Sequence, residues 1–130
     1  MVLEWPSKYN RLAMRAELKR LHSPDVTELR DWVPDDVDFA ILLQIIVGPM
    51  NAAGEESFDV TLCSIACLER RLASEKIIAG YHLLVVSDYN YDVLHGYINR
   101  YVSSCSGETW RDVAAKLARL GEWEFEDYRE

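Results

Sequence analysis

Apolar and polar residues along the chain follow two periods, one of about two residues and one of about three to four, which indicate strands and helices. Residues 14–22 fit both, because apolar and charged side chains alternate there while several apolar ones also share a helical face. Helix propensity is high in this segment. We predict a strand, because Ser23 and Pro24 then form the cap and first position of a following helix. That helix would end at Pro34 and bury Val26, Leu29 and Val33.

The next two segments predict a β-hairpin. Residues 39–47 are nearly all apolar and rich in β-branched side chains, which is typical of a strand buried on both faces. Residues 57–64 alternate between apolar and polar side chains, which predicts a strand with one wet face. Residues 48–56 between them are too few for a parallel crossover, so we expect an antiparallel pair with a mobile tip.

The middle of the chain predicts a helix, a strand and a second helix. Ser64 can cap a helix over residues 65–74, and residues 81–87 form a strand after Gly80. A polar, tyrosine-rich turn over residues 88–92 then begins a strongly periodic helix. We expect that helix to end at Ser106-Gly107 and to bury Leu94, Tyr97, Ile98, Tyr101, Val102 and Cys105.

The last helix is marked by a capping box formed by Thr109 and Asp112. Gly121 is well placed just beyond its end. Aromatic and acidic residues then alternate over residues 122–128, which predicts a final strand or an extended segment with its aromatic side chains inward. The expected inward side chains of the helix and the strand are Trp110, Val113, Ala114, Leu117, Leu120, Trp123 and Phe125.

Together these elements predict a single α+β domain over residues 14–130. The sheet should be mostly antiparallel or mixed, with four to five strands and with helices packed mainly on one face. Residues 1–13 have no clean period and contain a Trp-Pro-Ser turn signal. We expect them to form an N-terminal arm that is disordered or loosely attached.

The length and composition agree with one small globular domain. The chain has 130 residues, of which 49% are apolar and 28% charged. Its longest apolar run is far shorter than the roughly 20 residues that span a bilayer, and its first residues lack a signal-peptide layout. Three cysteines do not make a disulfide framework. These features predict a cytoplasmic protein that does not insert into membranes.

The net charge of −8 arises from 14 basic and 22 acidic side chains. Residues 1–21 carry five basic and two acidic side chains, so residues 22–130 carry −11. Such a surface repels phosphate backbones, which disfavours direct binding of nucleic acid or of an anionic membrane. It favours a basic protein partner. The alternative is that the charge only keeps the domain soluble.

The histidines and cysteines do not have the spacing of a metal site. His22, His82 and His95 lie far apart along the chain, and Cys63 and Cys67 form one isolated pair rather than two. Small apolar thiols of this kind usually pack in a core. We therefore predict buried structural cysteines, no metal and no cofactor.

The chain also lacks the local motifs of nucleophilic catalysis and of phosphate-binding loops. Cys105 and His95 would lie about 15 Å apart along one helix, too far for a hydrogen bond. The paired acids fall in turns or on a wet strand face, so we expect them to be solvated rather than catalytic. These pairs are Asp35/Asp36, Glu55/Glu56 and Glu124/Glu126. We predict that the protein is not an enzyme.

One loop favours contact with a partner. Tyr89 and Tyr91 lie between Asp88 and Asp92 in the same strand-to-helix connection. Exposed tyrosines supply a large contact area at low entropic cost, and aromatic side chains flanked by acids suit the docking of a basic protein.

Several stretches of the sequence resemble the immunity protein 8 family of bacterial polymorphic-toxin and contact-dependent inhibition systems. The resemblance covers residues 14–130, and its most specific part is the last block, where G-E-T-W is followed by G-x-W-E-F-E-D-Y. The stretches that carry it are residues 14–19 with 22–25, residues 54–60, residues 87–92, and residues 105–110 continuing to 121–128.

The resemblance implies a small cytoplasmic protein without enzymatic activity that binds the C-terminal toxin domain encoded beside it. The toxin would be basic, commonly a nuclease, and a homo-oligomer is not indicated. The residues expected to face the toxin are Glu55, Glu56, Asp88, Tyr89, Tyr91, Asp92, Glu124 and Glu126. Two other classes stay open: a small enzyme with an acidic or Cys/His site, and a generic acidic adaptor for another basic protein.

Overall fold

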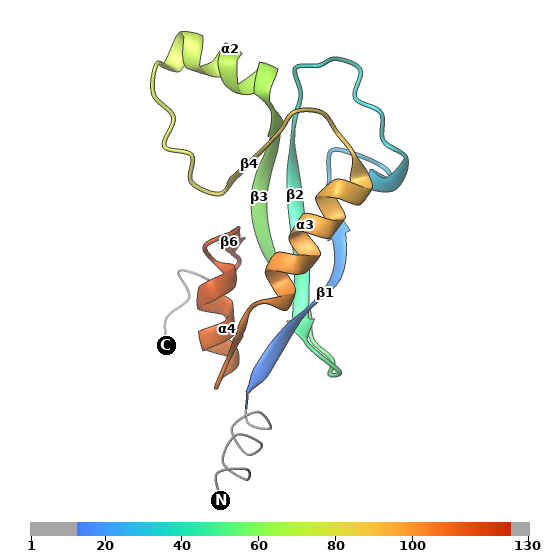
Figure 1. Ribbon diagram of the computed structural model, residues 1–130, viewed down its shortest axis with the longest axis vertical. Coiled ribbons are helices and arrows are strands. Elements are labelled where there is room, and N and C mark those ends of the chain that lie inside the picture. Colours follow the sequence, from blue (N-terminus) through green and yellow to red (C-terminus); the bar gives the residue numbers. More distant parts are fainter. Residues whose placement is uncertain (1–12, 126–130) are drawn as a thin grey trace, which may run out of the picture.

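The centre of the fold is a long antiparallel hairpin of β2 (Ala40–Pro49) and β3 (Glu56–Ser64) (Figure 1). The computed structural model describes residues 13–125. The two strands pair without interruption from Ala40 opposite Cys63 to Val47 opposite Glu56. The predicted hairpin is therefore confirmed. Its register places Leu43, Ile45 and Val60, whose side chains are at most 1% exposed, in the core.

The hairpin is extended on both sides into a mixed sheet. β1 (Met14–His22) pairs antiparallel with β2, which confirms the strand prediction, and the short β5 (Ser106–Gly107) pairs with the start of β1. On the other side, β4 (Leu83–Val86) is parallel to β3. β6 (Glu122–Trp123) is antiparallel to β3 near its beginning.

The strand order is β4-β3-β2-β1-β5, with β6 beside β3. The predicted α+β class and mixed sheet are confirmed, although β5 and β6 raise the strand number to six. The structure corrects one detail: Ser106 and Gly107 do not simply end a helix but form β5.

Within residues 13–125, three α-helices accompany the sheet, and side chains cap each of them. Ser64 accepts a hydrogen bond from the backbone of Cys67 at the start of α2 (Ile65–Glu75), and Asn90 does the same for α3 (Tyr91–Ser103). The predicted capping box of Thr109 and Asp112 begins α4 (Trp110–Leu117). Among the described residues, no helix is long and apolar enough to cross a membrane.

The core lies between the sheet and the inner faces of α3 and α4. Leu94, Ile98 and Val102 of α3 are buried, as predicted, but Tyr97 is 47% exposed and that part of the prediction is wrong. The aromatic side chains near the C-terminus are less buried than expected, since Trp110 and Trp123 are half-buried and Phe125 is exposed.

The predicted helix after Ser23 is wrong. The segment contains only a 3₁₀ turn, η1 (Leu29–Asp31), and Val33 is 79% exposed. Tertiary contacts hold the segment in another shape: the Asp25 carboxylate accepts the backbone N–H of Leu42 at 2.8 Å, which ties the segment to β2. Periodicity was a poor guide here because these contacts override a weak local preference.

The close approach of Gly48 to the backbone of Gly54, where the hairpin turns, gives a test of the fold. A Cβ atom at Gly48 would lie 2.0 Å from the carbonyl oxygen of Gly54, so Gly48→Ala cannot be accommodated without moving backbone. We expect it to lower the free energy of unfolding by about 1–3 kcal/mol, measured by urea denaturation. The matched control is Gly96→Ala in α3, where the nearest atom is the flexible Arg100 Nη1 at 3.4 Å. This control should be neutral or stabilising by up to about 1 kcal/mol.

Candidate functional site

The predicted toxin-facing residues fall into two groups at opposite ends of the central hairpin (Figure 1). Glu55 and Glu56 lie at the hairpin tip, whereas the Asp88–Asp92 loop follows β4, whose last residue pairs with Ser64 at the far end of β3. A strand of this length spans roughly 25–30 Å. The two groups therefore do not form one continuous patch. Glu126 lies outside the described residues.

At the hairpin end, Glu56 is engaged in an internal network. Its Oε1 atom accepts hydrogen bonds from the indole N–H of Trp110 at 2.9 Å and of Trp123 at 2.8 Å. The Trp123 ring also stacks on buried Phe58, with the ring centres 6.2 Å apart. One carboxylate oxygen therefore joins the beginning of β3, the first residue of α4 and β6.

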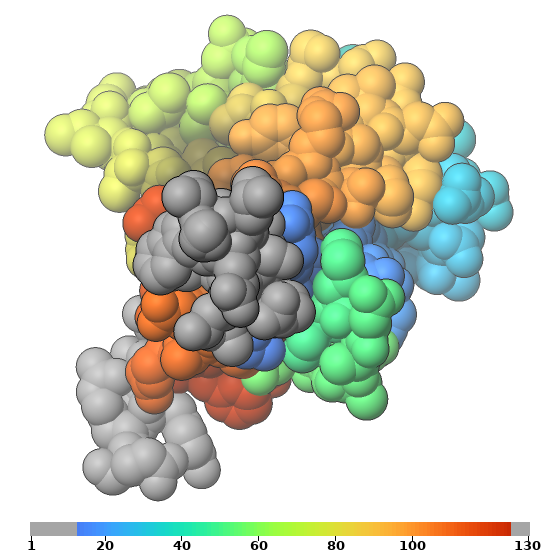
Figure 2. Space-filling view, turned by 60° about the horizontal axis from the view of Figure 1, so that its bottom comes forward, coloured from blue at the N-terminus to red at the C-terminus, as the bar shows by residue number. Residues whose placement is uncertain are grey.

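The neighbouring acids also have partners within the chain. Glu55 forms an ion pair with Arg20 of β1 at 3.2 Å, and the Glu124 carboxylate accepts the backbone N–H of Ser57 at 2.6 Å. Figure 2 shows the hairpin tip, in green, next to β1, in blue. These contacts give the hairpin-end acids structural roles that the sequence pattern did not indicate.

At the other end, Asp88 and Asp92 are exposed. Asp88 accepts a hydrogen bond from the Ser87 hydroxyl at 3.4 Å, and within residues 13–125 neither acid forms an ion pair. Asn90 between them caps α3 and so fixes the path of the loop. These two acids are therefore presented to solvent on a well-defined loop.

The two tyrosines of this loop are partly held by the fold. The Tyr89 hydroxyl donates to the backbone carbonyl of Leu29 at 2.5 Å, and its ring meets Trp32 edge to face with the centres 4.7 Å apart. Burial raises the pKa of Tyr89 to about 12. The Arg30 guanidinium lies 4.6 Å from the centre of the Tyr91 ring. These contacts anchor the loop and leave each ring only partly available to a partner.

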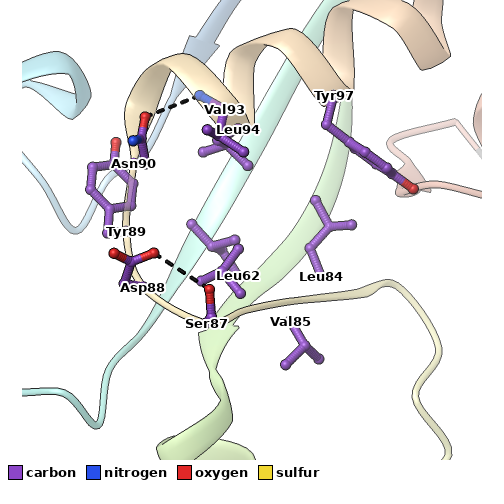
Figure 3. A pocket seen from close by; sticks show the side chains of 11 residues that line it. Leu62, Leu84, Val85, Ser87, Asp88, Tyr89, Asn90, Val93, Leu94 and Tyr97 are labelled. Carbon is purple, nitrogen blue, oxygen red and sulfur yellow. Dashed lines mark hydrogen bonds between the residues drawn. The ribbon is translucent and has the colours of Figure 1, made fainter.

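An open apolar groove of about 520 Å³ lies beside the loop (Figure 3). Leu62 and Leu84 of β3 and β4 line it on the sheet side, and Val93 and Tyr97 line it on the α3 side. Val93, in the first turn of α3, is 67% exposed. Asp88 and Asn90 supply polar groups at the same groove. We refer to it as the β4–α3 groove.

A second, smaller cavity of about 320 Å³ brings another acidic segment to this loop. It is lined by Asp35, Asp36 and the 77%-exposed Val37 together with Asp88 and Tyr89. The sequence pattern indicated only that Asp35 and Asp36 are a solvated pair in a turn. No local pattern could place them beside Asp88, because about fifty residues separate the two segments along the chain.

The neighbouring Asp38 is engaged differently. It forms an ion pair with Arg70 of α2, and this hydrogen-bonded guanidinium lowers the pKa of the Asp38 carboxyl. Asp35, Asp36, Asp88 and Asp92, by contrast, have no basic side chain at ion-pair distance within the part of the chain that the structure describes. We call these four residues the acidic end of the molecule.

The thiols and histidines do not assemble a reactive site. Cys105 is buried just beyond the end of α3, and burial raises its pKa and that of Cys63, which keeps both thiols protonated near neutral pH. His95 lies near the start of α3 beside Tyr91, whereas Cys105 lies beyond the last residue of that helix. Within residues 13–125, no group of three His, Cys, Asp or Glu side chains is placed to hold a metal ion.

Comparison with known proteins gives one match. The model of a family described as immunity protein 8 matches residues 16–128, which is nearly the whole chain. No curated protein and no solved structure matches the chain. The matched region includes both ends of the central hairpin and the β4–α3 groove.

The two adjacent hairpin acids allow a matched test of their roles. Glu56→Ala leaves the indole N–H groups of Trp110 and Trp123 without their shared acceptor, so we expect the free energy of unfolding to fall by about 1–3 kcal/mol. Glu55→Ala removes only a half-exposed ion pair, which is worth about 0–1 kcal/mol. Urea denaturation of both variants checks this, and equal effects would contradict the bridging role of Glu56.

The anchoring of Tyr89 predicts a pH dependence of stability. Its folded-state pKa of about 12 lies above the ordinary value of 10.0, so the folded state holds this proton more tightly. The resulting stabilisation is complete below pH 10 and is lost as the pH rises toward 12. We expect Tyr89→Phe to lower the free energy of unfolding by about 1 kcal/mol at neutral pH. This difference from the unsubstituted protein should shrink as the pH rises from 10.0 to about 12. Urea denaturation at a series of pH values measures it. Tyr81→Phe, at a 75%-exposed position, is the control and should follow the unsubstituted protein throughout.

Proposed function

The chain belongs to the immunity protein 8 family, and from this premise we propose that it neutralises a cognate toxin by binding it stoichiometrically through the acidic end. Membership implies an immunity protein whose partner is a toxin. The finer parts of the proposal are that the toxin domain is basic, that it is nuclease-like, and that the complex forms in the cytoplasm without a catalytic step or a cofactor.

The observation that carries the proposal is that the acidic end lies directly beside the β4–α3 groove. Asp88 lies at both, and Val93 and Tyr97 give the groove exposed apolar surface. Apolar contact area next to unpaired charge is the usual make-up of a specific protein interface. A negative net charge of −8 then favours a positively charged partner over a neutral or acidic one.

A nuclease fits this chemistry because its active groove must hold phosphates and is therefore cationic. An acidic protein seated in that groove excludes the nucleic acid both by occupying space and by neutralising charge. Attraction between opposite charges also speeds association, which matters when newly made toxin must be captured before it acts. Complexes between nucleases and their immunity proteins are among the tightest known.

The hairpin-end acids enter the proposal as a second contact area. Glu55, Glu56, Glu124 and Glu126 lie in family-like stretches, and those whose contacts are described already have partners in the chain. A toxin domain large enough to touch both ends could use them. We assign the primary contact to Asp88 and Asp92 because these carboxylates are exposed and unpaired within residues 13–125.

The test uses the toxin domain encoded by the neighbouring gene and a charge reversal at the acidic end. Asp88→Lys combined with Asp92→Lys should slow toxin association at low salt by about tenfold or more, measured by surface plasmon resonance. The defect should shrink as salt is added, because screening weakens steering. Folding should change little, with a loss of about 1 kcal/mol or less from the cation that Asp92→Lys puts at the start of α3.

The matched control reverses the same amount of charge elsewhere. Glu108→Lys combined with Glu122→Lys alters two exposed acids that lie outside the acidic end. This control should associate nearly as fast as the unsubstituted protein. Equal slowing by both pairs would show that only net charge matters. Absence of toxin binding by the unsubstituted protein at low salt, or failure of co-expression to rescue growth, would overturn the proposed function.

A further inference from the structure

Within residues 13–125, two of the longer strands have an unpaired side: β4, and β1 from Glu17 onward. On β1, Lys19, Arg20 and a bulge between Leu18 and Arg20 discourage the addition of a further strand. β4 has no such protection. β5, at the opposite edge, is only two residues long. β3 is paired on both sides, by β2 along its length and by β4 and β6 on the other side. Within residues 13–125, β4 pairs with β3 alone. A strand in this position has one row of backbone groups that face no other strand.

The outward groups can be identified from one hydrogen bond. The His82 carbonyl accepts the backbone N–H of Thr61 at 3.0 Å, so it points toward β3. In a trans peptide the next N–H, that of Leu83, points the opposite way. Alternation along the strand then directs the N–H and C=O groups of Leu83 and Val85 away from β3, and those of Leu84 and Val86 toward it. No hydrogen bond within residues 13–125 uses the outward groups.

The side chains of β4 do not protect this edge. Natural edge strands usually carry a lysine or another charged residue, or a proline, which discourages pairing with a further strand. β4 has the sequence Leu-Leu-Val-Val. Leu84 and Val85 both line the β4–α3 groove, but their side chains point to opposite sides of the strand, and Val85 is 43% exposed (Figure 3). An extended segment added here would find apolar surface on both faces of the sheet.

We propose that the cognate toxin adds an extended segment of its own to the edge of β4 as a further strand. The toxin backbone pairs with Leu83 and Val85, and alternate toxin side chains lie in the β4–α3 groove. A lysine or arginine of that segment reaches Asp88, which lines the groove where β4 ends. This inference rests on the proposed function and specifies how the partner is held.

Charge selects the toxin over a second copy of this chain as the occupant. Two copies paired along β4 would bring together two chains of net charge −8 each. A basic segment would instead gain an attraction at Asp88 that an acidic or neutral one lacks. The groove supplies apolar area, and the edge supplies hydrogen bonds that do not depend on side-chain identity.

Two substitutions at one position separate backbone pairing from side-chain contact. Val85→Pro removes an outward N–H and leaves the bonds to β3 in place, so the fold should tolerate it as edge strands tolerate proline. Val85→Thr changes the side chain and keeps the N–H. We expect Val85→Pro to weaken binding of the neighbouring toxin domain by about tenfold or more, and Val85→Thr to change it less than about threefold. Urea denaturation verifies that both variants are folded.

Amide hydrogen exchange gives a second readout that needs no substitution. In the free protein, the N–H groups of Leu83 and Val85 should exchange quickly, and saturation with the toxin domain should protect both. Toxin binding with neither amide protected, or with Val85→Pro binding like Val85→Thr, would overturn strand addition and leave the proposed function standing. Absence of toxin binding would overturn both. A dimer of the free chain that Val85→Pro abolishes would assign the edge to a second copy and also overturn the proposal.

Discussion

Within residues 13–125, β3 pairs with three other strands, and this pairing organises the whole sheet. β2 occupies one side of β3 along its whole length, while the other side is divided between β6 near Phe58 and β4 from Thr61 onward. Because hydrogen bonds fix the register of each pair, β3 determines where the chain enters α3 and where the C-terminal segment returns. The apolar alternation of β3 keeps Phe58, Val60 and Leu62 in the core and so makes this arrangement stable.

This division of β3 gives the two ends of the sheet different chemistry. At the hairpin tip, β6 brings Trp123 close enough to share the Glu56 carboxylate with Trp110, so an acid there stabilises the fold. At the other end, β4 leads into a loop that Asn90 and Tyr89 anchor while Asp88 and Asp92 remain exposed. Acidic residues that look alike in the sequence therefore differ, because Glu56 is bonded to donors from distant segments whereas Asp88 and Asp92 are exposed and form no ion pair within residues 13–125.

Much of the fold could be predicted from the chain alone where local chemistry is strong. The alternation in residues 57–64 and the apolar run in residues 39–47 predicted the hairpin, and Ser64 and Thr109 predicted helix starts. The helix expected after Ser23 failed because Asp25 bonds to the backbone of β2, a contact between segments that no periodicity reports. Tyr97 was misplaced for a related reason: its helical position is apolar in pattern but lies over the open groove.

For the site, three features could be read from the sequence: the acidic excess, the loop at residues 88–92 and the resemblance that the family match supports. Those are properties of the composition and of the order of neighbouring residues, which can be read directly from the sequence. Three features of the site depend on the folded arrangement of distant segments. Asp35 and Asp36 lie beside Asp88, two indole N–H groups bond to Glu56, and one side of β4 has no strand partner within residues 13–125. These depend on sheet order and register, which are determined by contacts between distant segments rather than by any single one of them.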